Sequence, residues 1–198
     1  MNKPYSTACE RNREPILKVL RDAFAHARAV LEIGSGTGQH AVYFARHLPH
    51  LTWHTSDLPQ HHAGINEWIA GESLVNIKTP VSLNVCDEHW LVSGIDGLYT
   101  ANTLHIMNWD AVQAFFRGAG RVFTDSGVLV AYGPFKYNGQ YTSASNAQFD
   151  ADLRSRGVGS GLRDFESVDA LAAAQGFVLE ADHAMPANNR TLVWRRRA

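Results

Sequence analysis

The sequence has few of the features that mark specialised classes of protein. Two cysteines in 198 residues are too few for a disulfide framework and suit a reducing cytosol, so we expect a cytoplasmic protein. No apolar run reaches membrane-spanning length, and the N-terminus lacks the apolar segment of a signal peptide. The 18 lysines and arginines nearly balance the 19 acidic residues, so we expect neither a nucleic acid nor a membrane as partner.

A metal-binding pattern is also missing. The sequence has ten histidines, but the group His47, His50, His54, His61 and His62 has no cysteine or acid at a recognised zinc spacing, so we assign no metal. The remaining composition is ordinary, with 45% hydrophobic and 19% charged residues, and the chain is long enough to bury a substantial core. We expect one domain over residues 1–198, in which residues 1–9 form a polar, irregular N-terminal arm.

The most informative stretch is a glycine-rich loop between a predicted strand and a predicted helix. The apolar residues 29–33 predict a buried strand, and Gly34, Gly36 and Gly38 follow it at once. Apolar residues then recur along 41–48 with the spacing of one helix face. Because glycine permits positive φ and close approach of a ligand to the backbone, this loop indicates a nucleotide-type cofactor.

The spacing of the glycines favours one cofactor over its rivals. A dinucleotide fingerprint needs a glycine where this chain has Gln39, and a P-loop needs a Gly-Lys-Ser/Thr that is absent. With Glu32 the loop becomes E-x-G-x-G-x-G, which resembles motif I of class I S-adenosylmethionine (SAM) methyltransferases. The plain structural alternative is a tight turn without a ligand.

Strands and helices alternate along the chain. Besides the helix after the glycines, helices are predicted over residues 10–27, 61–70, 110–123, 146–156 and 165–175. Strands are predicted over residues 29–33, 51–55, 81–85, 96–101, 127–132, 177–184 and 191–195. This order predicts an α/β, Rossmann-like class I methyltransferase fold: a seven-stranded, mostly parallel sheet with an antiparallel last strand and helices on both faces. Residues 133–145 are expected to form a loop, and Asn188-Asn189 to occupy the positive-φ positions of a hairpin.

Residues at the strand ends supply candidate contacts for SAM. Asp57 ends the second predicted strand, where a carboxylate accepts hydrogen bonds from a ribose diol, although a capping role is the alternative. Asp87 ends the third predicted strand, where methyltransferases commonly hold the adenine amino group. An arginine of the first helix offers bidentate geometry to the methionine carboxylate. The expected cofactor-binding residues are Arg11, Glu32, Gly34, Ser35, Gly36, Gly38, Asp57, Leu58, Cys86, Asp87 and Asn102.

The acceptor is expected at the ends of the fourth and fifth strands, since ligands of open α/β sheets bind outside the strand C-termini. Here Asn102 and His105 are the catalytic candidates, with His105 as general base or, alternatively, as a packed histidine. The sequence Asn-Thr-Leu-His argues against DNA-adenine and protein-glutamine methylation, which use Asn/Asp-Pro-Pro-Tyr/Phe. The expected substrate-binding residues, which alternatively pin the loop to the surface, are Phe135, Lys136, Tyr137, Tyr141 and Asn188.

Seven blocks across nearly the whole chain carry a more specific resemblance. They are residues 8–17, 31–40, 101–106, 132–135, 145–156, 161–164 and 185–189. In this order the blocks resemble the methyltransferase-like 26 family of uncharacterised proteins, and the second block implies SAM binding. We therefore expect a SAM-dependent methyltransferase acting on a small molecule, with the oligomeric state left open. The rivals are a non-catalytic SAM-binding module and, less favoured, a nicotinamide-dependent oxidoreductase.

Overall fold

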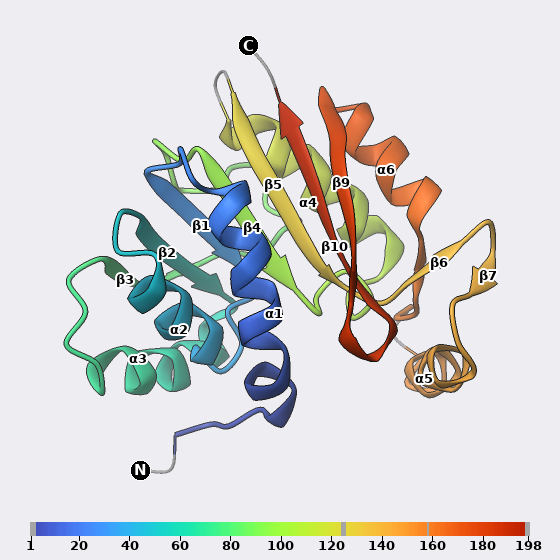
Figure 1. Cartoon of the computed structure of the whole chain (residues 1–198), viewed down its shortest axis with the longest axis horizontal. Coiled ribbons are helices and arrows are strands. Elements are labelled where there is room, and N and C mark those ends of the chain that lie inside the picture. The colour runs from blue at the N-terminus through green and yellow to red at the C-terminus, as the bar shows by residue number, and fades with distance from the viewer. Residues whose placement is uncertain (1–2, 124–125, 158, 197–198) are drawn as a thin grey trace.

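A seven-stranded sheet forms the centre of the computed structural model, which describes residues 3–123, 126–157 and 159–196 (Figure 1). Its strands are β1 (Ala29–Ile33), β2 (Thr52–Asp57), β3 (Ile77–Ser82), β4 (Gly97–Ala101), β5 (Gly127–Gly133), β9 (Phe177–Met185) and β10 (Asn189–Arg196). They lie in the order β3-β2-β1-β4-β5-β10-β9. The first five pair in parallel, and β10 is antiparallel to both β5 and β9, which confirms the predicted sheet.

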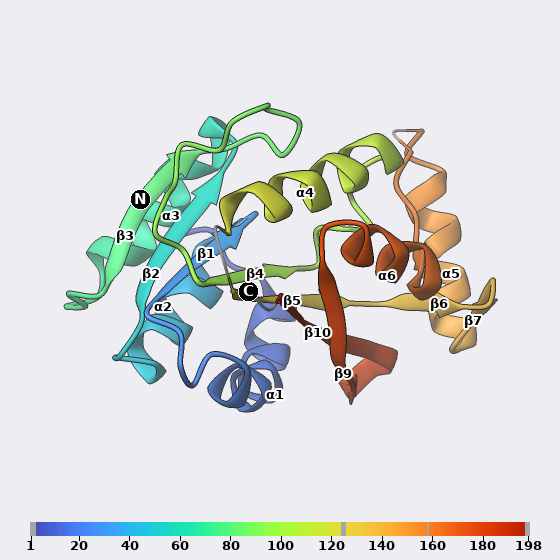
Figure 2. The same ribbon diagram turned by 90° about the horizontal axis from the view of Figure 1, so that it is seen from above.

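Helices cover both faces of the sheet, as predicted. Figure 2 shows α1 (Thr7–Ala23) and α2 (Gln39–His47) on one face, and α4 (Trp109–Val122) and α6 (Phe165–Ala173) on the other. Helix α3 (His62–Ala70) packs beside α2, and α5 (Ala144–Arg154) lies at the outer end of the molecule. Two short 3-10 turns, η1 (Pro59–His61) and η2 (Pro186–Asn188), complete the helical elements of the described residues.

The alternation of side chains along the strands divides the core into two layers. In β1, Val30 packs into the cluster under α1 and α2, whereas Leu31 and Ile33 pack into the cluster under α4 and α6. Successive side chains of a strand point to opposite faces, so Glu32 must also point toward α1 and α2. This places the acid of the glycine motif on the opposite face of the sheet from Ile33.

The first helix begins earlier and ends earlier than predicted. Helix α1 starts at Thr7, because Ser6 acts as its N-cap and accepts a hydrogen bond from Cys9 N (3.3 Å) on its hydroxyl. Residues 7–9 of the expected arm are therefore helical, and Met1 and Asn2 lie outside the described residues. The helix ends at Ala23 rather than at Ala27.

The third strand was predicted four residues too late at its start. Strand β3 covers Ile77–Ser82, and Leu83 and Val85 are buried beyond its end. This strand is an edge strand that contains Pro80 and exposes several polar side chains, so its pattern is weak, whereas the apolar residues that follow imitate a strand. Asp87 consequently lies five residues after the strand rather than at its end.

Two further expectations about the C-terminal half need correction. The expected loop 133–145 contains β6 (Phe135–Tyr137) and β7 (Gln140–Tyr141), which form a small sheet with β8 (Arg163–Asp164). In the hairpin before β10, the positive φ angles belong to Ala187 (57°) and Asn188 (55°), whereas Asn189 has a φ of −90°. The hairpin therefore turns one residue earlier than the Asn-Asn pair suggests.

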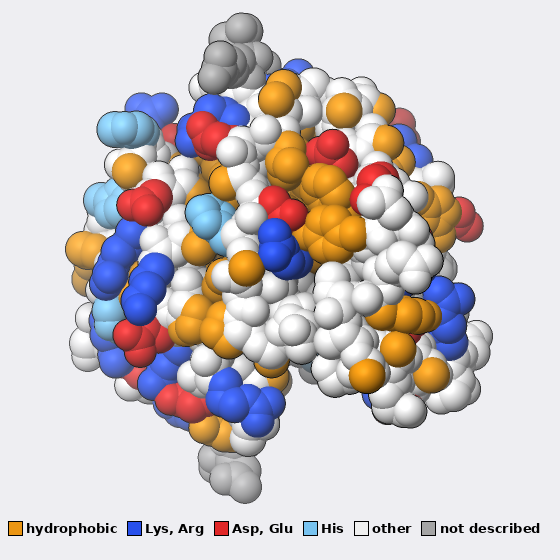
Figure 3. Space-filling view, turned by 45° about the vertical axis from the view of Figure 1, so that its right-hand side comes forward, with side chains coloured by type: hydrophobic (Ala, Val, Ile, Leu, Met, Phe, Trp, Pro, Cys, Tyr) orange, Lys and Arg blue, Asp and Glu red, His pale blue; other side chains and the backbone are white. Residues whose placement is uncertain are grey.

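The helices and the surface charge bear on whether the protein binds a membrane or a nucleic acid. No helix among the described residues is long and apolar enough to cross a membrane. On the face shown in Figure 3, acidic and basic side chains lie interspersed, without a continuous patch of either sign. This agrees with a formal net charge of −1 for the whole chain.

Candidate functional site

The glycine loop is folded against β2 and against the chain that follows β4. Gly34 N and Ser35 N both donate to Ser56 O (3.0 Å each). Gly34 has a φ of +74°, and a Cβ there would lie 2.5 Å from the methyl group of Thr103. A glycine is therefore required at this position by conformation and by space. Thr103 itself is held by a hydroxyl contact with Thr100, whose hydroxyl also donates to Ile33 O (2.9 Å), the carbonyl just before the loop.

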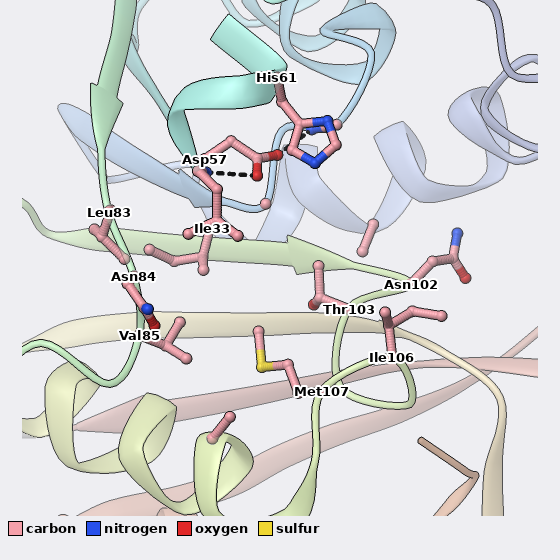
Figure 4. Close-up of a pocket in the computed structure, with 15 residues that line it drawn as sticks. Ile33, Asp57, His61, Leu83, Asn84, Val85, Asn102, Thr103, Ile106 and Met107 are labelled. Atoms are coloured by element: carbon pink, nitrogen blue, oxygen red, sulfur yellow. Dashed lines mark hydrogen bonds between the residues drawn. The ribbon is translucent and has the colours of Figure 1, made fainter. Parts of the chain in front are cut away.

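A cavity of about 420 Å³ opens beside this loop (Figure 4). Its volume lies within the range of roughly 300–1,000 Å³ that is usual for small-molecule sites. Most of its lining side chains are apolar, and the few polar groups come from the ends of β2, β3 and β4 and from η1. The lining residues are Ile33, Gly34, Gly36, Asp57, Leu58, His61, Leu83, Asn84, Val85, Ala101, Asn102, Thr103, Ile106, Met107 and Ala111.

Asp57 is fixed at the rim of this cavity by the backbone. One carboxylate oxygen accepts from Gly36 N and the other from Leu58 N, both at 2.7 Å. A carboxylate has about four acceptor positions, so two remain for a ligand. Figure 4 shows the imidazole of His61 beside this carboxylate. The charge of Asp57 is thus presented in a fixed orientation.

Asp87, the expected adenine contact, does not line this cavity. The Asp87 carboxylate accepts from Asn84 N (3.3 Å), and Asp87 N donates to Asn84 O (2.9 Å), so Asp87 stabilises the turn that carries Asn84. Cys86 is exposed and does not line the cavity either. The polar side chain that faces the cavity after β3 is Asn84, between the apolar side chains of Leu83 and Val85.

Glu32 is deeply buried beside the glycine loop. Its side chain is 2% exposed, and one carboxylate oxygen accepts from Ser35 Oγ (3.0 Å) and Trp53 Nε1 (3.1 Å). Burial raises the pKa of this carboxyl to about 7, although the two hydrogen bonds oppose the rise. Neither Glu32 nor Ser35 lines the cavity; together they stabilise the glycine loop from the α1–α2 side.

The two catalytic candidates are neighbours but differ in their position. Asn102 lines the cavity with a positive φ of 57°, a conformation that asparagine tolerates better than most residues. His105 is 5% exposed, packs edge-on against Phe149 with ring centroids 5.4 Å apart, and does not line the cavity. Burial and the nearby charge of Arg163 lower the pKa of His105 to about 4, so the imidazole is neutral near pH 7.

The expected substrate residues are held in other contacts. Phe135 is buried in the core, and Lys136 pairs with Asp164 (3.2 Å). The remaining contacts are Tyr137 OH to Asp182 (2.8 Å), Tyr141 OH to Asp150 (2.6 Å) and Asn188 O to the side-chain amide of Asn146 (3.0 Å). None of these five residues lines the 420 Å³ cavity.

The N-terminal arm covers the start of α2. The Gln39 side chain accepts from Ser6 N and donates to Ser6 O (3.4 Å), while Trp68 Nε1 donates to Pro4 O (2.7 Å). The arm borders a second hollow of about 460 Å³, which shares Gly36 and His61 with the first cavity.

Two further expected cofactor residues lie outside the 420 Å³ cavity lining. Gly38 packs against α3. Arg11 is exposed on α1, and its charge lowers the pKa of Tyr132, although burial raises that pKa more strongly.

The cavity therefore unites only part of the predicted set. It contains Gly34, Gly36, Asp57, Leu58 and Asn102 among the expected residues. A group of lining residues from the β3 end, the β4 turn and η1 was not predicted from the sequence, and only the block of residues 101–106 pointed to part of it. That group is His61, Leu83, Asn84, Val85, Thr103, Ile106 and Met107. Among the described residues, no three histidine, cysteine or acidic side chains are grouped to hold a metal ion.

Comparison with known proteins assigns the family. Residues 3–196 match the family described as "Protein of unknown function (DUF938)". The chain belongs to the DUF938 family. The match covers almost the whole chain, so the glycine loop, the cavity and the C-terminal hairpin of this DUF938 protein all lie within the matched region.

Solved structures share the fold of this DUF938 protein. An O-methyltransferase family protein from Burkholderia thailandensis matches with a TM-score of 0.84 and 18% identity over 96% of this chain and 58% of its own. The mitomycin 7-O-methyltransferase MmcR matches with 0.82 and 19%, over 97% and 55%. PigF, solved with S-adenosylhomocysteine (SAH), matches with 0.76 and 17%, over 93% and 61%. The chain thus spans little more than half the length of these methyltransferases, and the likeness establishes the fold.

The raised pKa of Glu32 predicts a pH-dependent contribution to stability. The folded protein binds this proton more tightly than the unfolded chain, so the stabilisation is complete below pH 4.5 and is lost as the pH rises through about 7. Relative to Glu32→Gln, the wild-type free energy of unfolding should fall by roughly 2–3 kcal/mol between pH 5 and pH 8. Urea unfolding of both proteins measures this difference, and the comparison cancels other titrating groups. A difference that does not vary with pH would contradict the assignment.

Proposed function

We propose that this DUF938 protein is a SAM-dependent methyltransferase that acts on a small-molecule acceptor. The observation that carries the proposal is the cavity beside the glycine loop, with Asp57 held at its rim by Gly36 N and Leu58 N. Support comes from the methyltransferase fold of the solved neighbours, one of which was solved with SAH. The resemblance of seven sequence blocks to the methyltransferase-like 26 family is part of this proposal.

The chemistry of the cavity fits the parts of SAM. The two free acceptor positions of Asp57 suit a ribose diol. The apolar walls at Leu58, Val85 and Met107, with the Asn84 amide among them, suit an adenine ring and its polar edge. Arg11 and Glu32 remain candidates for the methionine end, through the α1 side of the loop. When bound, SAM supplies an electrophilic methyl group on a positively charged sulfur.

A nicotinamide dinucleotide fits less well. Its pyrophosphate would bind at the N-terminus of α2, where free backbone N–H groups and the helix dipole favour an anion. In this protein Gln39 begins that helix, and its side-chain amide both accepts from Ser6 N and donates to Ser6 O. The arm therefore occupies the position where a pyrophosphate would have to approach, and the oxidoreductase is the weaker proposal.

Methyl transfer requires alignment of donor and acceptor more than acid–base chemistry. We assign the alignment to Asn102 and to the β4 turn that follows it, because both line the cavity. His105 is a poor general base at neutral pH, since its pKa of about 4 is far from the operating pH. It remains a candidate only as a neutral neighbour of Asn102. We place the acceptor outside the ends of β4 and β5.

Calorimetric titration tests which cofactor the protein binds. SAM and SAH should bind with micromolar affinity, whereas NADH should give no signal under the same conditions. Release of SAH after addition of small-molecule extract fractions would then establish an enzyme. Binding without turnover in any fraction would favour the non-catalytic SAM-binding module, and silent SAM with bound NADH would refute the proposal.

Replacement of Asp57 tests the ribose assignment. Asp57→Ala should weaken SAM binding by about 1–3 kcal/mol, because charged hydrogen bonds to the diol are lost. Asp96→Ala is the matched control: its carboxylate also accepts two backbone N–H groups, from Arg28 and Ala29, but at the start of β4, the opposite end of the parallel strands from Asp57. The control should lose stability and keep its SAM affinity, as measured by calorimetry. Equal SAM affinity in Asp57→Ala and wild type would remove Asp57 from the site.

A further inference from the structure

The turn after β4, residues 103–107, is held by one distant segment, residues 159–163, which we call the clamp. Thr103 O accepts from Ile106 N (2.9 Å) and Met107 N (3.1 Å), so these amides are satisfied within the turn. The next four carbonyls all accept hydrogen bonds from the clamp. These bonds are Arg163 Nε to Leu104 O (3.0 Å), Gly161 N to His105 O (2.9 Å), Ser160 Oγ to Ile106 O (2.7 Å) and the Arg163 guanidinium to Met107 O.

The clamp is anchored in turn by a buried carboxylate. Asp150 of α5 is fully buried and accepts from Leu162 N (2.6 Å), Tyr141 OH (2.6 Å) and Arg154 Nε (2.8 Å). Burial raises the pKa of Asp150, but the hydrogen bonds lower it more, so the net direction is downward and the carboxylate stays charged. Two of the sequence blocks therefore contribute to holding the β4 turn: residues 161–164 bond its carbonyls, and residues 145–156 supply Asp150, which anchors the clamp.

Arg163 is the part of the clamp that joins both ends of the turn. Its guanidinium also donates to Gly159 O (3.0 Å) and lies over the ring of Trp109, 5.8 Å from the centroid. No carboxylate within the described ranges, 3–123, 126–157 and 159–196, lies within ion-pair distance of it. This half-buried cation is therefore committed to backbone carbonyls. A lysine could not replace it, because one ammonium cannot match the planar fork.

We propose that Arg163 is a positioning residue that fixes the cavity wall formed by Ile106 and Met107. Both side chains line the cavity, and Ile106 is 49% exposed at its mouth, so the shape of the wall depends on the backbone of the turn. Figure 4 shows this wall across the cavity from Asp57 and His61. The consequence for SAM rests on the proposed function; the fixing of the wall does not.

Two variants with matched controls test the clamp. Arg163→Lys removes the fork, and the milder Ser160→Ala removes only the bond to Ile106 O. Arg190→Lys is the control for the first: Arg190 bonds Asp182 (2.7 Å) and lies over Tyr137, outside the cavity lining. Ser155→Ala is the control for the second, because Ser155 Oγ bonds a carbonyl of α5 and none of the turn.

The first readout needs no ligand. The chain has three methionines, so methyl-labelled methionine gives a simple spectrum in which Met107 reports the wall and Met185 is the reference. The Met107 methyl signal should shift or broaden in Arg163→Lys and Ser160→Ala and stay in place in both controls. An unchanged Met107 signal in Arg163→Lys, or an equal change in Arg190→Lys, overturns the proposal.

SAM affinity is the second readout. Arg163→Lys should raise the Kd for SAM about tenfold and Ser160→Ala about threefold, while the control variants keep the wild-type value even where their melting temperature falls. A changed Met107 signal with wild-type affinity in both clamp variants also overturns the positioning role. If the wild-type protein binds no SAM, the proposed function fails, and the clamp is judged by the Met107 signal alone.

Discussion

The close approach of the glycine loop to the β4 end is the constraint on which the site depends. Because Gly34 has no side chain, Thr103 can lie against the loop. The two hydrogen bonds from Gly34 N and Ser35 N to Ser56 O hold the same loop against β2. The ends of β1, β2 and β4 thereby meet around one cavity, and the segment after β3 completes its lining. A larger residue at Gly34 would separate the β4 turn from the loop and enlarge the gap between the groups that we assign to the donor and to the acceptor.

Each wall of the cavity is then fixed by backbone hydrogen bonds rather than by exposed ion pairs, which contribute little. Asp57 is oriented by two amides, the β3 end by the turn at Asn84, and the β4 turn by the clamp. Such groups do not need to reorganise when a ligand binds, which suits a reaction that depends on alignment. The apolar lining and the few convergent polar groups are the usual composition of a small-molecule site.

The sequence predicted the sheet and the glycine loop because their signals are local. Residues 29–48 show a strand, a glycine turn and a helix in direct succession, and the alternating elements leave little choice of topology. The sequence did not predict Asn84 or Met107, because their roles depend on where an edge strand ends and on contacts with residues more than fifty positions away. Tyr137 and Tyr141 were predicted as substrate residues, and the sequence did not predict that their hydroxyls bond Asp182 and Asp150, because no local pattern reveals these partners.

A crystal structure of the protein with SAH would show whether the cavity beside the glycine loop binds SAM. We expect ribose density within hydrogen-bond distance of the Asp57 carboxylate and adenine between Leu58 and Val85, next to Asn84. SAH seated instead in the hollow beside Pro4 and Gln60, or no SAH density at a concentration that saturates related methyltransferases, would contradict it.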